Sequence, residues 1–168
     1  LQDYRDQSSD PSVIEIVRNP DVPATTKLEQ LQVRIGQQRF RREVLEFFDN
    51  KCAITGSSLL IRASHIKPWR VATNEERLNP ANGLALSPVY DAAFDLGLIS
   101  IRPDGQIMLS PRIESDSAAL GITGAEKIDS LTDEHFAFLD WHRKNIFGAS
   151  MANTTLQGTL RDKAAQRP

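Results

Sequence analysis

The sequence predicts a domain of the α+β class. Two stretches, 26–50 and 133–147, carry apolar residues at the spacing of a helix face. Between them lie short apolar segments separated by turn residues, which is typical of strands. A chain of 168 residues fits one domain, and 40% apolar residues, including two tryptophans and seven phenylalanines, suffice for a hydrophobic core.

Residues 1–25 are expected to be a linker or the end of an upstream domain. Pro11, Pro20 and Pro23 interrupt a polar stretch, and the apolar piece 13–17 could form an edge strand. The chain begins with Leu1 rather than Met, which agrees with an origin in a longer protein.

Residues 26–50 are expected to form two helices separated at Gly36. Thr26 is followed three residues later by Glu29, the pattern of a capping box. Apolar residues then continue on one face before and after the glycine.

The middle of the sequence predicts strands at 51–56 and 59–66, with Pro68 ending the second. A polar loop is expected over 70–80 and a short strand over 83–86. Ser87 followed by Pro88 then predicts the start of a helix, because serine is a preferred N-cap and proline suits the first helical position. This helix should end at 95 or 96, before Gly97.

The remaining sequence predicts a hairpin, a helix and a tail. Two apolar segments, 98–101 and 106–109, flank a Pro-Asp-Gly turn. The segment 133–147 has helical periodicity, whereas 148–168 is rich in polar and small residues and is expected to be disordered. The domain should therefore span 26–147.

The charge of the chain is unevenly distributed. The net charge is −2, but 27–77 holds ten Lys or Arg against six Asp or Glu, and 91–140 holds three against ten. The basic part is suited to an anionic partner such as nucleic acid. The single cysteine, Cys52, excludes an internal disulfide and agrees with a cytoplasmic location. No segment resembles a signal peptide or a membrane span, so no membrane partner is expected.

Four residues with chemical potential stand at fixed distances in the middle of the sequence. Asn82 follows His65 by 17 residues, Asp91 follows Asn82 by nine, and Asp95 follows Asp91 by four. A histidine titrates near neutral pH and can take a proton from water. Two carboxylates four apart share a helix face and can bind one hard cation. An asparagine can donate and accept at once, and so can fix the loop that carries His65.

The motifs around these residues resemble those of HNH endonucleases. They are CAITG at 52–56, ASHIKPW at 63–69, NGL at 82–84 and FDLGLI at 94–99. The resemblance covers about 34–110, and the motifs are most similar to those of the prokaryotic HNH subfamily found in restriction and defence enzymes.

The resemblance implies a ββα-metal (HNH) core with flanking N-terminal helices, a following β-hairpin and a C-terminal helix. It also implies a divalent-metal-dependent DNA endonuclease, the cleavage domain of a restriction or defence enzyme in the cytoplasm of a prokaryotic cell. His65 would be the general base, Asn82 its brace, and Asp91, with Asp95, the ligand of one Mg²⁺ or Mn²⁺ ion. Double-stranded DNA is the expected partner, with a homodimer and an upstream targeting domain as further expectations.

Two positions depart from the family pattern. Many HNH enzymes carry a metal-binding Asp or His directly before the base, where this chain has Ser64, a weaker ligand. The family is often stapled by zinc-binding cysteine pairs, but Cys52 has no cysteine partner, so no structural zinc is expected.

Basic and aromatic residues near the motif are candidates for contacts with DNA phosphates. They are Arg41, Arg42, Arg62, Lys67, Arg70 and Tyr90, of which Tyr90 could equally be a packing residue. An alternative to an enzyme is a catalytically inactive HNH-like module that binds DNA or a protein, which Ser64 favours. A third reading is a nuclease that acts on RNA or serves as a toxin.

Overall fold

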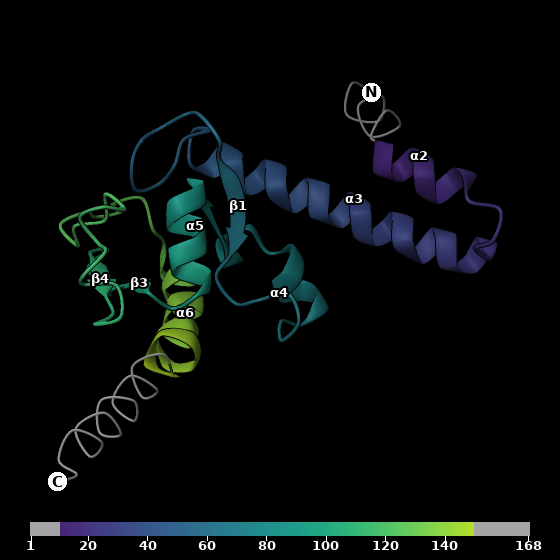
Figure 1. Cartoon of the computed structure of the whole chain (residues 1–168). Helices are drawn as coiled ribbons and strands as arrows, with labels where there is room; N and C mark the ends of the chain where they lie inside the picture. Colours follow the sequence, from purple (N-terminus) through teal and green to yellow (C-terminus); the bar gives the residue numbers. More distant parts are fainter. Residues whose placement is uncertain (1–10, 150–168) are drawn as a thin grey trace, which may run out of the picture.

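The computed structural model describes residues 11–149, in which a small α+β core carries a projecting pair of helices (Figure 1). The helices α2 and α3 form the projecting pair, and the core contains two separate two-stranded sheets. The elements in chain order are α2 Pro11–Arg18, α3 Ala24–Phe47, β1 Arg62–His65, α4 Asn74–Leu78, a 3₁₀ turn Pro80–Asn82, β2 Gly83–Leu86, α5 Pro88–Asp95, β3 Ile99–Ile101, β4 Ile107–Leu109, α6 Asp133–His142 and a π-helical turn Arg143–Phe147.

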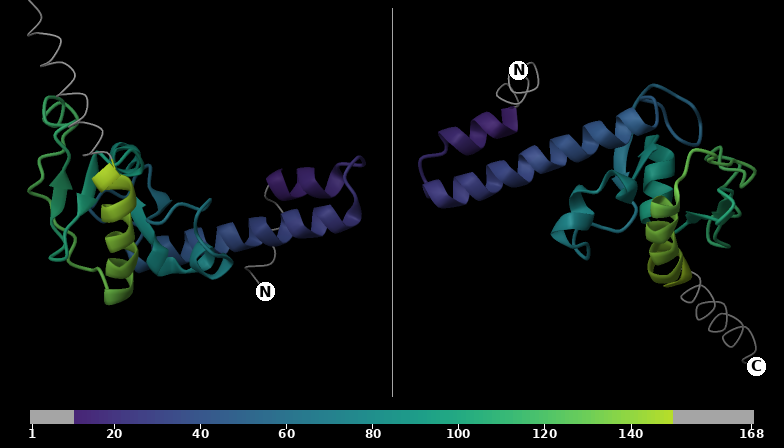
Figure 2. Two further views of the ribbon diagram at one scale, coloured as in Figure 1. Left: turned by 90° about the horizontal axis from the view of Figure 1, so that it is seen from below. Right: turned by 180° about the vertical axis from the view of Figure 1, so that it is seen from behind.

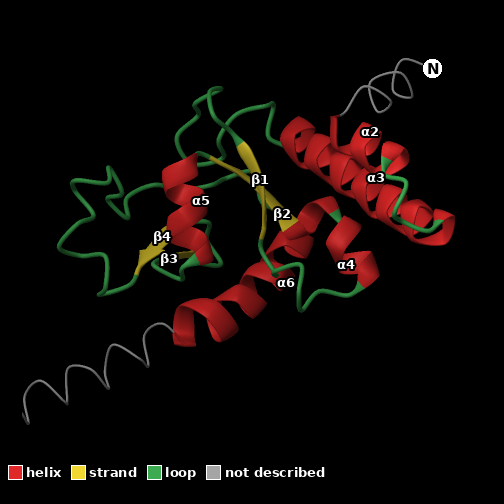
Figure 3. Ribbon diagram, turned by 45° about the vertical axis from the view of Figure 1, so that its right-hand side comes forward, coloured by secondary structure: helices red, strands yellow, loops and turns green. Residues whose placement is uncertain are grey.

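The first hairpin lies between two helices. β1 and β2 pair in antiparallel fashion, with Arg62 opposite Leu86 and His65 opposite Gly83. Figure 3 shows the hairpin between α5 and the C-terminal half of α3. Successive side chains of a strand point to opposite faces. His65 therefore faces α3, whereas Arg62 and Ser64 face α5.

β2 is buried along its whole length because helices cover both of its faces. Leu84 and Leu86 are fully buried, and Gly83 leaves room for α3 on the opposite face. A Cβ atom added at Gly83 would overlap Val44 Cγ2 and lie 2.8 Å from Phe40 Cζ. The absence of a side chain at this position thus sets how closely α3 approaches the hairpin.

The second hairpin and α6 complete the core, and a buried histidine joins them. His142 at the end of α6 is only 1% exposed, and its ring stacks on Phe94 of α5 at a centroid distance of 3.8 Å. Its Nε2 lies 3.1 Å from the Phe94 carbonyl oxygen and its Nδ1 lies 3.0 Å from Ser100 Oγ of β3. The burial lowers the pKa of His142 to about 4. One neutral ring therefore links α6, α5 and β3.

Several elements confirm the sequence-based expectations. The strand at 83–86, the helix after Ser87 and the hairpin across the Pro-Asp-Gly turn are all present. The helix expected over 133–147 is present as α6 with its π-helical last turn. These elements carry strong local signals, which explains why the sequence identifies them.

The expectations for the N-terminal part were wrong in three respects. The apolar piece 13–17 lies in α2 rather than in an edge strand, and α3 runs through Gly36 without a break. α3 begins after Pro23 with no side-chain cap, so the capping box at Thr26 is absent. A Cβ atom at Gly36 would lie 2.8 Å from Leu78 Cδ2, so the glycine serves the contact with α4 rather than a helix break.

The strand expected at 51–56 was also wrong, because this segment is a turn held by the sulfur atom of Cys52. The buried Cys52 Sγ accepts hydrogen bonds from the backbone N–H groups of Thr55 and Ser87, at 3.5 and 3.2 Å. The thiol therefore fastens this turn to the start of α5. The loop expected over 70–80 contains the short helix α4, which begins with a capping box formed by Thr73 and Glu76.

The loop that joins α2 to α3 lies at the end of the projecting pair that is remote from the second hairpin (Figure 2). Most of the tail expected to be disordered, 150–168, lies outside the described residues, as does the N-terminal segment 1–10. Within 11–149, no helix combines the length and apolar character that a bilayer crossing demands.

Candidate active site

His65 stands at the end of β1 between two aromatic side chains. Its ring stacks on Phe40 of α3 at 3.9 Å and nearly parallel, and Trp69 meets its edge at 5.7 Å. This packing removes water from the ring, which lowers the pKa of His65, although a hydrogen bond to the Arg77 carbonyl opposes the shift. His65 is therefore held neutral and in a defined orientation.

The hydrogen bond of His65 decides which nitrogen carries the proton. Nε2 lies 3.0 Å from the backbone carbonyl oxygen of Arg77. A carbonyl oxygen can only accept, so Nε2 donates and Nδ1 keeps its lone pair. No partner for Nδ1 occurs among residues 11–149. The neutral ring thus presents an unprotonated nitrogen, as a general base requires.

Asn82 fixes the loop that supports His65. The amide of Asn82 is fully buried, and its Oδ1 accepts a hydrogen bond of 2.7 Å from the Lys67 N–H. Its Nδ2 donates to the carbonyl oxygens of Lys67 at 3.2 Å and of Glu76 at 2.9 Å. One side chain therefore joins the segment after β1 to α4, the helix that carries the Arg77 carbonyl.

Lys67 is occupied by an ion pair and is not directed to solvent. Its Nζ lies 2.7 Å from both carboxylate oxygens of Glu76, and its side chain is 16% exposed. The contact lowers the pKa of Glu76, whose carboxylate also caps α4 at Thr73. This arrangement speaks against the prediction that Lys67 binds a phosphate and indicates a bracing role.

The predicted metal ligands lie on the other side of the hairpin. Asp91 and Asp95 are one turn apart on α5, and Arg62 Nη1 lies 3.0 Å from Asp91 Oδ2. Ser64, on the same face of β1 as Arg62, is 6% exposed. Asp95 is exposed as a residue, but packing around its carboxylate and the charge of Asp91 raise its pKa, while Arg62 opposes that rise.

This donor set fits a Mg²⁺- or Mn²⁺-type ion. No group of three or more metal-ligating His, Cys, Asp or Glu side chains occurs within 11–149, so a closed protein cage is absent there. Mg²⁺ typically takes one or two carboxylates and fills its other positions with water and substrate phosphate. Asp91 and Asp95 supply two such oxygen donors. Burial and then the charge of Asp91 raise the pKa of Asp95, and a cation beside the two carboxylates would relieve their repulsion.

The structure separates the predicted DNA-binding residues into two groups. Tyr90 is 4% exposed and its hydroxyl donates to Gly121 O and Glu126 Oε1, so it is a packing residue of the core. Arg41, Arg62 and Arg70 are exposed, and Arg42 is half-buried on α3. Of these, Arg41 lines a hollow together with His65 and Trp69.

Three residues of the site were not predicted from the sequence. Phe40 and Trp69 enclose the His65 ring, and the Arg77 backbone accepts its proton-bearing nitrogen. The Arg77 guanidinium also lies over Trp69 at 5.0 Å and donates to the Trp69 carbonyl. The sequence pointed only to Trp69, which lies in the same motif as His65. Phe40 precedes His65 by 25 residues, so no local pattern links the two.

The hairpin of β1 and β2 and the helix α5 follow one another around His65, Asn82 and Asp91, in the ββα order that the HNH resemblance implies. Residues 52–102 match the family model described as HNH endonuclease. This part of the chain is an HNH endonuclease domain, of a family of phosphodiester hydrolases. No curated protein matches the chain.

Proposed function

We propose that the chain is a divalent-metal-dependent endonuclease that hydrolyses phosphodiester bonds in DNA. The observation that carries the proposal is the hydrogen bond from His65 Nε2 to the Arg77 carbonyl, which leaves Nδ1 unprotonated. The match of 52–102 to HNH endonucleases supports the reaction class. The basic character of 27–77 supports DNA as the substrate.

Each residue has one task in the proposed mechanism. His65 takes a proton from the attacking water, while Phe40 and Trp69 keep its ring in place. Asn82 holds the loop on which this geometry depends. Asp91 and Asp95 would hold the cation, which when bound supplies charge stabilisation to the phosphate and its leaving oxygen.

In the proposed mechanism, His65 and Asp91 act on one phosphate although they lie on opposite faces of the β1–β2 hairpin. His65 faces α3, whereas Arg62 and Asp91 lie on the α5 side. β1 pairs only with β2 within 11–149, so its outer edge has no strand partner. A phosphate lying across this edge would be within reach of both faces. Arg62, released from Asp91, would then be available to the phosphate.

The proposed biological role is cleavage within a restriction or defence enzyme, and its support is the likeness of the motifs to that subfamily. In this proposal an upstream domain selects the DNA, and two copies cut the two strands, because each chain offers one base and one pair of carboxylates. The ion is proposed to be Mg²⁺ or Mn²⁺, in keeping with the oxygen donors.

The direct test is cleavage of plasmid DNA in the presence of Mg²⁺ or Mn²⁺. His65→Gln retains an N–H donor for the Arg77 carbonyl but has no nitrogen base, so we expect at least a hundredfold loss of nicking with the fold retained. Circular dichroism and thermal unfolding check the fold. Nicking at the wild-type rate by His65→Gln would refute the proposal.

A binding module that does not cut is the second candidate, favoured by Ser64 at a ligand position and by the pairing of Arg62 with Asp91. Calorimetric titration with Mn²⁺ separates the two candidates. The enzyme is expected to bind the ion and to lose binding in Asp91→Asn. If the wild-type chain binds DNA, does not bind the ion and does not cut DNA, it is a binding module.

A further inference from the structure

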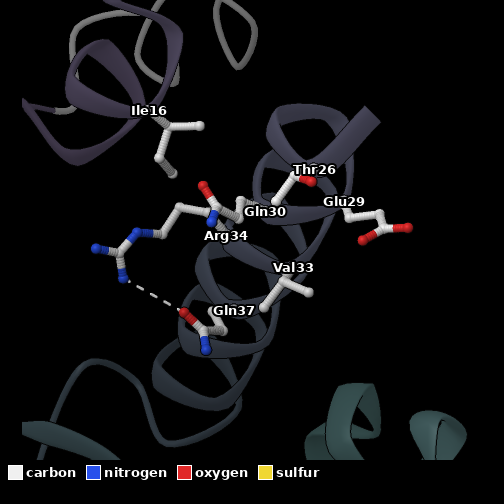
Figure 4. A pocket seen from close by; sticks show the side chains of 7 residues that line it. All are labelled: Ile16, Thr26, Glu29, Gln30, Val33, Arg34 and Gln37. Carbon is white, nitrogen blue, oxygen red and sulfur yellow. Dashed lines mark hydrogen bonds between the residues drawn. The ribbon is translucent and has the colours of Figure 1, made fainter. Parts of the chain in front are cut away.

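A groove along α3 leads to His65. Its outer part is a hollow of about 520 Å³ between α2 and α3, with Ile16 on one side and Gln30, Arg34 and Gln37 on the other (Figure 4). Its inner part is a hollow of about 250 Å³ that contains His65. A third hollow lies between α3 and α4.

The three hollows lie next to one another, since neighbouring ones share lining side chains. Gln37 lines both the outer hollow and the His65 hollow. Val33 joins the outer hollow to the one beside α4, and Trp69 joins that one to the His65 hollow. A chain bound along α3 would therefore pass from one hollow to the next on its way to the base.

The floor of the groove is one face of α3. Thr26, Gln30, Arg34, Gln37 and Arg41 follow one another at intervals of three or four residues, the spacing of a single helix face. All five are at least partly exposed. Phe40 follows Gln37 by three residues and Val44 follows Phe40 by four, so the same face of α3 passes into the core at its C-terminal end.

The chemistry of the groove suits a phosphodiester chain. Its cations are Arg34, Arg41 and Arg77, whereas Glu29 is its single carboxylate. Guanidinium groups bind phosphate through two parallel hydrogen bonds, and amides such as Gln30 can donate to phosphate or sugar oxygens. An acidic protein segment would meet the same cations, but the row of amides and the continuity with a nuclease base favour nucleic acid.

We propose that this groove is an extended binding site for the DNA that flanks the scissile phosphate on one side. The inference rests on the proposed function, because it takes His65 as the cleavage point. From Thr26 to Arg41 the helix rises about 22 Å. At 3.4 Å per base pair, this length matches about six base pairs of duplex. Arg34 is the cation farthest from His65 and is assigned to a phosphate several nucleotides away.

The test compares the DNA affinity of Arg34→Ala with that of Arg39→Ala. Arg39 lies on the same helix outside the groove, where it pairs with Glu43. Affinity for a 30-base-pair duplex is measured by fluorescence anisotropy in Mg²⁺-free buffer over a range of salt concentrations. Arg34→Ala should weaken binding about three- to tenfold near 0.1 M salt and reduce the slope of log K against log salt by about one, because one phosphate contact is lost. Arg39→Ala should bind as the wild type does.

A second variant guards against an effect on folding. Gln30→Glu places a negative charge on the exposed floor of the groove and should also weaken binding, with unfolding temperatures of both variants near the wild-type value. Equal affinity in wild type, Arg34→Ala and Gln30→Glu would overturn the inference. So would a changed oligomeric state without loss of DNA affinity, because the groove would then hold a second copy of the chain.

Plasmid cleavage by the wild type separates this inference from the proposed function. If the wild type cleaves DNA and the groove variants bind DNA with unchanged affinity, the endonuclease is supported and the groove as a DNA site is refuted. If the wild type does not cleave DNA but the same variants bind DNA more weakly, the groove as a DNA site is supported and the endonuclease is refuted.

Discussion

The guanidinium of Arg62 lies 3.0 Å from the carboxylate of Asp91, the proposed metal ligand. The pair joins β1 to α5, and the Arg62 side chain is 62% exposed whereas that of Asp91 is 11% exposed. In the free protein an arginine thus supplies the positive charge that a metal ion would otherwise supply. Metal binding must compete with this contact.

Arg62→Ala is expected to tighten Mn²⁺ binding. Because the arginine is mostly exposed, its ion pair is worth no more than about 1 kcal/mol, which corresponds to about a two- to fivefold gain in affinity. Isothermal titration calorimetry measures the change, and Arg39→Ala serves as the control with an equal loss of charge. Weaker Mn²⁺ binding in Arg62→Ala alone would show instead that Arg62 orients Asp91 for the ion.

Asn82→Ala is expected to destabilise the fold by about 2–4 kcal/mol, because it leaves a cavity at a fully buried position and leaves a part-buried N–H and two part-buried carbonyl groups without their partner. The loop that supports His65 would loosen as well, so cleavage should fall together with stability. Urea unfolding measures the loss. Asn145→Ala, which removes one exposed hydrogen bond, should change stability by less than about 0.5 kcal/mol. Equal effects of the two substitutions would contradict the bracing role.

The protein is expected to lose stability as the pH falls from 6.5 towards 4. The pKa of His142 is about 4 in the folded chain against 6.5 in the unfolded chain, so the unfolded chain binds the extra proton first. The pKa values of His65 and His135 are lowered too, with burial as the main cause, and act in the same direction. His142 alone accounts for about 3 kcal/mol over this range.

Urea unfolding at several pH values measures this loss. In His142→Gln the unfolding free energy should change less steeply with pH in this range, because the contribution of about one bound proton to the slope is removed. The same slope in both proteins would show that His142 is not the group responsible.

Gly83→Ala is expected to destabilise the fold by about 1–3 kcal/mol, because the new methyl group would overlap Val44 and press on Phe40, the side chain that stacks on His65. The rate of DNA cleavage should also fall, because the displaced Phe40 ring would no longer hold His65 in place. Val44→Ala makes room on the same face, so the double variant should lose less than the sum of the two single losses in thermal unfolding. If the stability loss of the double variant equals the sum of the two single losses, the methyl group at position 83 does not act through Val44.

The fold could be predicted where signals are local. Ser87 and Pro88 mark the start of α5, and the Pro-Asp-Gly turn marks the second hairpin, because these preferences act within a few residues. The start and length of α3 could not be predicted, since Gly36 is a weak helix residue that here packs against Leu78 of another helix. The turn at 51–56 has the composition of a strand, but two contacts with residues distant in sequence help to hold its shape: the Ser87 N–H donates to Cys52 Sγ, and the Ala53 N–H donates to the Ala85 carbonyl.

By itself the sequence determined the order and spacing of His65, Asn82, Asp91 and Asp95, and with them the match to HNH endonucleases, because such a motif is recognised from residue types and intervals alone. Only the tertiary structure decided the state of each group. It set the protonated nitrogen of His65 through Arg77, the pairing of Lys67 with Glu76 and that of Asp91 with Arg62. These contacts join residues 9 to 29 positions apart, so they arise only when the chain packs.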